Sequence, residues 1–283
     1  MRFQLKRISG ITPQREVSLA RTYPLQENMV RAAPSLPVLR QISFEDVGFA
    51  LRAGFEDFKA RPTHVIFLMA IYPIIGIILA FATVGQNVIP LFYPLLAGFA
   101  LIGPFAALGM YEISRQRELG HEITWREAFG VMRRANFLSM LGLGALLMAL
   151  FIGWLALAQI IYAQTLGTPP SFVADLVTRT FYTSEGWQLL FIGNLVGLCF
   201  ALLVLSISVI SFPLMLDKGV RMGDAMRCSM RAMTHSPGPI LAWGFIVAVL
   251  LLLGSLPFLI GLAIVLPILG HATWHLYRAV VPQ

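Results

Sequence analysis

Two histidines four positions apart, His271 and His275, are the residues of this chain best suited to chemistry. On a helix this HxxxH spacing places both imidazoles on one face, where they could bind a metal ion or one edge of a haem. The aromatic and basic residues around them, Trp274, Tyr277 and Arg278, are typical of an interfacial belt at a membrane surface. No acidic residue or cysteine stands nearby in the sequence. We therefore keep the pair as candidate metal ligands but expect no metal and no cofactor.

Motifs for other chemistry are missing from the sequence. It contains no Walker loop, no dinucleotide-binding glycine motif, no nucleophile elbow and no HExxH zinc motif. The two cysteines, Cys199 in an apolar run and Cys228 in a basic loop, are too few for a disulfide framework or a thiolate metal site. We therefore expect that the protein is not an enzyme and has no catalytic residues.

The composition is that of an integral membrane protein. Hydrophobic residues make up 57% of the chain and charged residues 12%, and the mean hydropathy is +0.76. A soluble domain carries roughly 25% charged residues. The first 41 residues differ, because they are polar, rich in proline and without sustained periodicity. We expect a flexible N-terminal arm over residues 1–41 and one membrane domain over residues 42–283.

Four apolar runs have roughly the 20 residues that a helix needs to cross a bilayer. They lie at residues 64–84, 88–111, 137–162 and 189–216. A fifth run, residues 240–277, would make a helix about 57 Å long, nearly twice the hydrocarbon thickness.

The motif GSLPF at residues 254–258 interrupts that last run. Proline lacks an amide hydrogen, and glycine and serine favour chain reversal, so the motif predicts either a kink in one tilted helix or the turn of a hairpin. The hairpin gives six transmembrane helices, arranged as hairpins over residues of about 64–111, 137–216 and 240–277.

The basic residues predict the topology. Of the 21 Lys and Arg residues, all but Arg179 precede the first run, follow the last, or lie between the second and third or the fourth and fifth. The positive-inside rule places these segments in the cytoplasm. Six crossings then put both termini there, in a multi-pass protein of the bacterial inner membrane whose basic loops face an anionic leaflet. The net charge of +7 does not imply nucleic acid binding.

Each predicted hairpin follows a similar cytoplasmic segment, which indicates an internal repeat. The segments are ISFEDVGFALRAGFEDFKARP from residue 42, ITWREAFGVMRRAN from residue 123 and VRMGDAMRCSMRAMTHSPGP from residue 220. Ser43 and Thr124 stand three residues before Asp46 and Glu127, the spacing of a helix capping box, whereas the third copy has Arg221 at that position.

Apolar residues recur at helical spacing in these segments, so we expect amphipathic helices at the inner membrane surface. The methionines of the third copy could form an adaptable groove for a partner or lie against the bilayer and the bundle. The residues expected to contact a partner or the membrane surface are Phe44, Val47, Leu51, Phe55, Phe58, Trp125, Met222, Met226, Met230 and Met233.

The expected architecture is an all-α membrane protein with six transmembrane helices in three hairpins, each preceded by a cytoplasmic amphipathic helix. With ISFEDVGFALRAGFEDF and this hairpin pattern, the chain resembles an uncharacterised proteobacterial family of predicted integral membrane proteins. Some members of that family are named cytochrome c oxidase subunit I-like. The resemblance covers about residues 42–277 and implies an architecture more than an activity.

The oxidase name does not fit a catalytic subunit, since a haem-copper core needs about six intramembrane histidines and this chain has five in total. An accessory subunit remains open. We therefore expect a non-catalytic accessory or assembly component of a larger membrane complex, for example a respiratory complex, or else an organiser of the bilayer. The alternative is a permease for a small solute or lipid, although the apolar runs hold none of the acidic residues on which coupled transport commonly relies.

Overall fold

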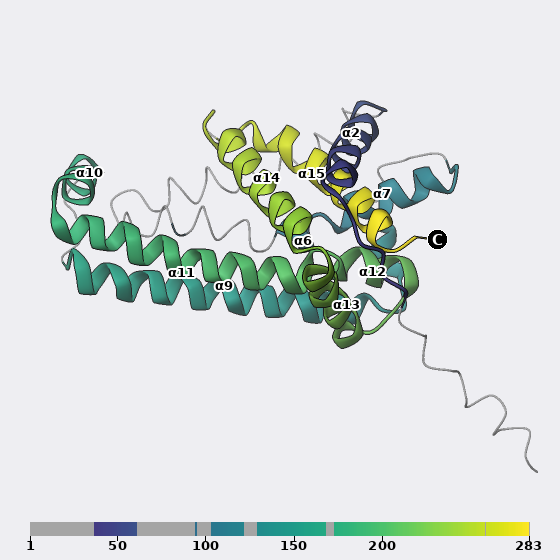
Figure 1. Cartoon of the computed structure of the whole chain (residues 1–283), viewed down its shortest axis with the longest axis horizontal. Coiled ribbons are helices and arrows are strands. Elements are labelled where there is room, and N and C mark those ends of the chain that lie inside the picture. Colours follow the sequence, from purple (N-terminus) through teal and green to yellow (C-terminus); the bar gives the residue numbers. More distant parts are fainter. Residues whose placement is uncertain are drawn as a thin grey trace, which may run out of the picture. The chain divides into compact units, whose positions relative to one another are not determined.

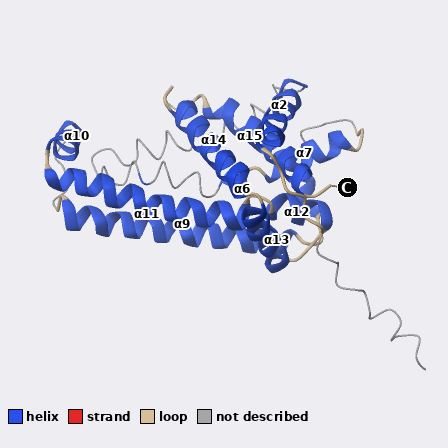
Figure 2. Ribbon diagram, viewed as in Figure 1, coloured by secondary structure: helices blue, strands red, loops and turns tan. Residues whose placement is uncertain are grey.

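The computed structural model describes residues 37–60, 94, 103–121, 129–167, 173–257 and 259–282. These residues form helices joined by short connections, and none of them lies in a β-strand (Figure 1, Figure 2). The arm up to residue 36, most of the first predicted hairpin, and the start of the second amphipathic segment with Trp125 lie outside the described residues.

Among the described residues, three stretches are long and apolar enough to cross a membrane. They are α9 (Phe137–Thr165), the stretch Ser184–Lys218, and α14 (Pro237–Ser255). They coincide with the third, fourth and fifth predicted spans. α9 and α11 (Ser184–Ser208) pack side by side along their lengths (Figure 1).

The structure adds detail around the fourth span. Ser184–Lys218 divides into α11 and α12 (Ser211–Lys218), a break that the sequence did not predict. α11 begins before the predicted span because Thr183 Oγ1 accepts a hydrogen bond from the amide of Gly186 at 3.0 Å. A short amphipathic helix, α10 (Val173–Tyr182), precedes it.

The GSLPF motif divides the last apolar run into two helices. α14 ends at Ser255, and α15 (Leu262–Val280) begins after a turn in which Leu259 has φ +65°. The two helices contact each other, so the chain turns back here instead of continuing as one kinked helix. α15 is not among the three stretches with the length and hydropathy of a span, and the six-span topology stays a prediction.

The capping box predicted at the start of the first amphipathic segment is confirmed. α2 (Phe44–Ala60) begins after Ser43, whose backbone amide donates to the Asp46 carboxylate at 2.8 Å. The amide of Asp46 donates in return to Ser43 Oγ at 3.3 Å. α13 (Met222–His235) follows Arg221, whose side chain makes no capping hydrogen bond, as its sequence indicated.

α15 is enclosed by α2 on one side and by α7 (Leu108–Glu118) on another. The face of α2 with Val47, Ala50, Gly54 and Phe58 is buried in this contact. Small residues bring the backbones close, because a Cβ placed on Gly54 would lie 2.6 Å from Cα of Ala272. A Cβ on Gly270 would similarly meet Met110 of α7.

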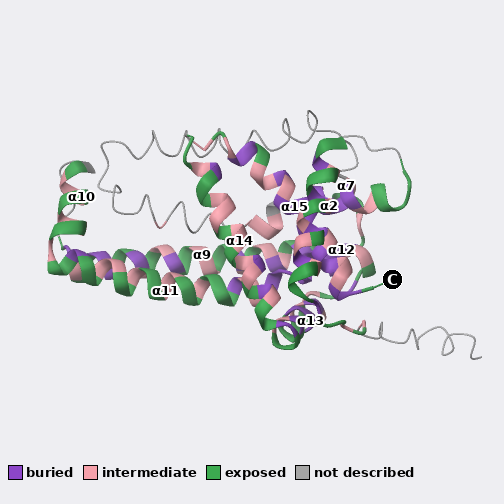
Figure 3. Cartoon of the chain, turned by 45° about the horizontal axis from the view of Figure 1, so that its top comes forward, coloured by how far each residue is buried: buried purple, intermediate pink, exposed green. Residues whose placement is uncertain are grey.

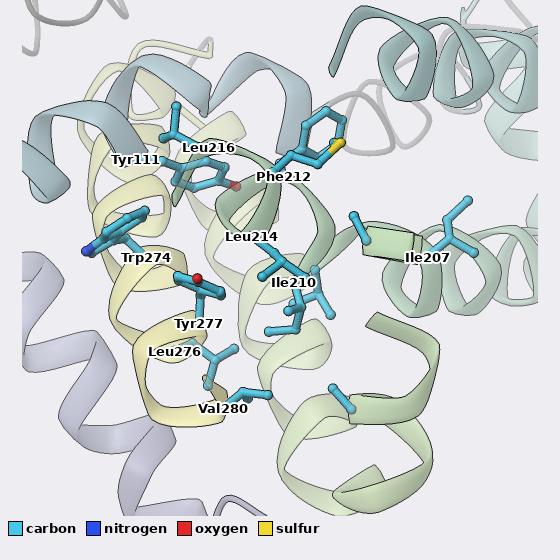
Figure 4. Packing of buried hydrophobic residues seen from close by; sticks show 14 of the residues in the cluster. Tyr111, Ile207, Ile210, Phe212, Leu214, Leu216, Trp274, Leu276, Tyr277 and Val280 are labelled. Carbon is cyan, nitrogen blue, oxygen red and sulfur yellow. The ribbon is translucent and has the colours of Figure 1, made fainter. Parts of the chain in front are cut away.

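The hydrophobic core is centred on α12 and the C-terminal half of α15. Residues Ser211 to Leu216 of α12 are all buried. Figure 4 shows buried side chains of both helices in this region, among them Phe212, Leu214 and Tyr277. The remaining described elements are α6 (Gly103–Ala106) and the 3-10 helix η3 (Phe129–Arg133).

Candidate functional site

The HxxxH pair lies where α2, α7 and α15 meet. His271 is fully buried, and the side chain of His275 is 23% exposed. Facing them are Asp57 from α2 and Ser114 from α7, both with buried side chains. The three helices thus place four polar side chains in one buried cluster.

Asp57 is the centre of this cluster. Its Oδ2 accepts hydrogen bonds from Ser114 Oγ at 2.6 Å and from His275 Nε2 at 2.9 Å. Its Oδ1 accepts from Arg117 Nη1 at 2.6 Å. Ser114 Oγ also lies 2.7 Å from His271 Nδ1. One carboxylate therefore joins α2 to both α7 and α15.

The surroundings of Asp57 favour its charged form. Burial raises the pKa of Asp57, but the hydrogen bonds from His275 and Ser114 lower it, and the pKa of Asp57 lies below the usual value. His271 differs from Asp57 in its hydrogen bonding, since the Nε2 atom of His271 is buried with no hydrogen-bond partner among the described residues. A proton there would leave a buried N–H group without an acceptor, which favours a neutral His271 whose Nδ1 hydrogen points to Ser114.

This arrangement is suited to holding helices together. His275 Nε2 and His271 Nδ1 already contact Asp57 and Ser114, and the described residues hold no group of three or more side chains that could bind a metal ion. Ser114 bonds directly to Asp57, whereas in a Ser-His-Asp triad the histidine lies between the serine and the carboxylate. At 2% exposure, Ser114 is also inaccessible to a substrate.

The aromatic residues next to the histidines do not form the predicted interfacial belt. Trp274 and Tyr277 are fully buried in the protein. The indole of Trp274 donates to Glu118 at 3.0 Å, and the hydroxyl of Tyr277 donates to Asp217 at 2.7 Å. The belt prediction was wrong here because these polar atoms find carboxylates on α7 and α12, which the local sequence does not reveal.

Arg278 ties the end of α15 to the same two carboxylates. It bonds to Glu118 at 2.9 Å and to Asp217 at 2.9 Å, with its guanidinium 4.8 Å from the centre of the Trp274 ring. Its side chain is only 15% exposed. The charged end of α15 is thus paired with neighbouring helices.

A third polar group surrounds Glu112 of α7. Its buried carboxylate accepts hydrogen bonds from Arg115 and Gln116 on the same helix and from Arg134 after η3. Burial raises the pKa of Glu112, but these bonds lower it below its usual value. α7 therefore carries two carboxylates, Glu112 and Glu118, that each connect it to another segment.

The predicted contact residues of α2 divide between two surfaces. Val47 and Phe58 are buried against the protein, and Leu51 packs partly on the core. Phe44 and Phe55 are 65% and 46% exposed. Figure 3 shows both buried and exposed faces on α2.

The methionines of α13 have mixed environments. Met222, Met226 and Met233 are partly buried and pack on the protein's own core. Met230 is 41% exposed. Trp125 lies outside the described residues.

Sequence reasoning missed Asp57 and Ser114 as partners of the histidines. Asp57 is 218 residues from His275, and Ser114 is 157 residues from His271. The only local signals were the HxxxH spacing and an acidic residue on the polar side of a predicted amphipathic helix. Neither signal indicates that the two helices meet.

The described part of the chain defines a helical protein with apolar helices of membrane-spanning length. Residues 92–217 match the model of a family described as predicted integral membrane protein, DUF2189. The match runs from the second predicted span to the end of α12. No curated protein and no solved structure matches the chain. The helices and the family match together make this an integral membrane protein.

Proposed function

We propose that the protein is a non-catalytic accessory or assembly component of a larger complex in the bacterial inner membrane, and that α2 contacts the partner. The observation that carries this proposal is the exposed apolar surface of α2. Phe44, Phe49 and Phe55 are 65%, 66% and 46% exposed on a helix whose other face is fixed against α15.

α2 is not itself a membrane span, which bears on what can cover these phenylalanines. It has 17 residues and carries charges along its length. Arg52 and Lys59 lie among the exposed residues, and Lys59 Nζ is 4.9 Å from the centre of the Phe55 ring. Exposed aromatic and basic side chains on a rigid helix suit a contact with another protein at the membrane surface.

The polar cluster supports the non-catalytic part of the proposal. A catalytic group must touch its substrate, and Ser114, His271 and Asp57 are enclosed by three helices and bonded to one another. The cluster instead fixes the direction in which α2 presents its phenylalanines. A respiratory complex is one assembly that such a component could serve.

The test is purification of the native complex in mild detergent. We expect the wild type to co-purify with a partner in fixed stoichiometry, and the variant Phe44→Ser/Phe49→Ser/Phe55→Ser to lose that partner while remaining folded. The control is Phe181→Ser/Tyr182→Ser, which removes exposed aromatic side chains from α10 and should retain the partner.

Two results would contradict the proposal. One is a triple variant that keeps every partner of the wild type. The other is a wild-type protein that purifies only with copies of itself and is stabilised against heat by a small solute or lipid, which would favour the permease.

A further inference from the structure

α13 is held at the membrane surface by its neighbours in the chain. It follows α12, which ends the span Ser184–Lys218, and precedes α14, the span Pro237–Ser255. Gly219, in the left-handed conformation, ends α12, and Ser236 alone separates α13 from α14. A helix tied at both ends to consecutive spans must lie where those spans leave the bilayer.

The orientation of α13 about its own axis is also fixed. Ala225, Cys228, Ser229 and Ala232 are buried against the protein. Ser229 Oγ accepts a hydrogen bond from the amide of Ile210 at the junction between α11 and α12. The opposite face of α13 is therefore the one that points outward.

That outward face is basic. The side chains of Arg221 and Arg227 are 83% and 71% exposed, and Arg231 is exposed as well. The nearest carboxylate, Asp224, lies 3.7 Å from Arg221 and 3.4 Å from Arg227, so one acidic group is shared by two arginines over long distances. Three arginines against one aspartate give this segment a net charge of +2.

Apolar side chains lie beside the arginines. Met230 is 41% exposed, and Met226 is partly exposed one helical turn before it. Arg227 and Arg231 are four residues apart and therefore share a face of the helix. A helix at the bilayer surface with flexible apolar side chains beside paired arginines has groups for both acyl chains and phosphates.

We propose that the outer face of α13 binds the phosphate groups of anionic phospholipids in the leaflet where α12 ends and α14 begins, with Arg227 and Arg231 as the principal contacts. This inference rests on the membrane placement in the proposed function but not on its partner. Free phosphate is a weaker match, because it would leave the adjacent methionines without an apolar environment.

The test uses the full-length protein in nanodiscs that contain equal amounts of phosphatidylcholine and phosphatidylglycerol. Native mass spectrometry of the released protein measures which lipid it retains. We expect the wild type to retain phosphatidylglycerol preferentially and Arg227→Gln/Arg231→Gln to lose that preference. At about fivefold for each basic residue near an anionic surface, the loss would be about thirtyfold.

Two controls define the effect. Arg227→Lys/Arg231→Lys keeps the charge and should retain most of the preference. Both substituted side chains are exposed, so all three proteins should unfold at the same temperature in nanodiscs of phosphatidylcholine alone.

Three results would overturn the inference. The first is unchanged retention of phosphatidylglycerol by the glutamine variant. The second is stabilisation of the wild type in phosphatidylcholine discs by inorganic phosphate to the same extent as by phosphatidylglycerol, which would indicate a site for the free anion. The third is loss of a co-purifying protein by the glutamine variant, which would indicate a protein contact.

The partner proposal for α2 and the lipid proposal for α13 can each be contradicted without affecting the other. The α2 triple-serine variant should retain phosphatidylglycerol whatever happens to its partner. Lipid selectivity that depends on Arg227 and Arg231 would support the α13 inference even if no partner binds α2.

Discussion

Asp57 has an unusual share of the contacts that hold α2 in place. Its two oxygens accept hydrogen bonds from Ser114 and Arg117 of α7 and from His275 of α15. A neutral side chain of the same shape would keep the packing but would place an NH₂ group against one of these donors. The cost of such a change is set by the groups left unpaired more than by the bond removed.

Replacing Asp57 with asparagine should therefore lower the free energy of unfolding by about 2 kcal/mol. Thermal unfolding of the purified protein in detergent measures the effect. Glu56→Gln is the matched control, because the neighbouring carboxylate is exposed, and it should unfold with the wild type. Equal melting of the two variants would show that the Asp57 contacts add nothing to stability.

The depressed pKa of Asp57 gives this contribution a defined pH dependence. A carboxylate whose folded pKa lies below its unfolded value of about 3.9 stabilises the protein above that value, and the stabilisation disappears as the pH falls through the folded pKa. The difference in melting temperature between wild type and Asp57→Asn should be present at about pH 5 and narrow below about pH 4. A difference that persists unchanged at the acid end would contradict this assignment.

For individual residues, the sequence identified only the two histidines of the buried polar cluster. The HxxxH spacing marked His271 and His275 as a pair, but their partners lie on helices far away in the chain. The same limit explains the incorrect belt at Trp274 and Tyr277. Residue type and local spacing do not determine which helix will supply a carboxylate.

The helices α2 and α15 approach closely because Gly54 has no side chain. A Cβ at that position would lie 2.6 Å from the backbone of Ala272, which cannot move without shifting α15. Gly48 lies on the same helix and has nothing within 4 Å of an added Cβ. The two glycines offer a test of the helix contact with one kind of substitution.

Gly54→Ala should destabilise the protein by about 1–3 kcal/mol through overpacking. Gly48→Ala should be neutral or stabilising by up to about 1 kcal/mol, because alanine favours a helix over glycine. Unfolding temperature and protease sensitivity of α2 measure both effects. Similar behaviour of the two variants would mean that α2 does not pack on α15 through Gly54.

The elements themselves were largely predictable. The apolar runs gave α9, the span Ser184–Lys218 and α14 to within a few residues, and the Ser43 and Asp46 spacing gave the start of α2. The break between α11 and α12 and the helix α10 were not predicted. Thr183 accepts a hydrogen bond from the backbone and Ser211 donates one to the backbone at these points, and neither residue changes the hydrophobic pattern enough to predict a helix boundary.

For the whole molecule, the chain reversal between α14 and α15 is the feature on which the topology depends. If α15 returns to the side on which α14 began, both ends of this pair lie on the cytoplasmic side, where the basic residues predict them. A reporter fused after Gln283 should then be cytoplasmic, and one inserted near Ser255 periplasmic. A periplasmic C-terminus would remove the sixth crossing and with it the third hairpin.

The packing of α2 on α15 joins the first described helix of the chain to the last. On the ribosome, 218 residues separate Asp57 from His275. At ordinary rates of synthesis, α15 would be made roughly ten to forty seconds after α2. During that interval Gly54, Asp57 and the apolar face around them have nothing of α15 to pack against. α2 can therefore take up its final orientation only on a completed chain, so a chain that stops before α15 would not present its phenylalanines in the same way.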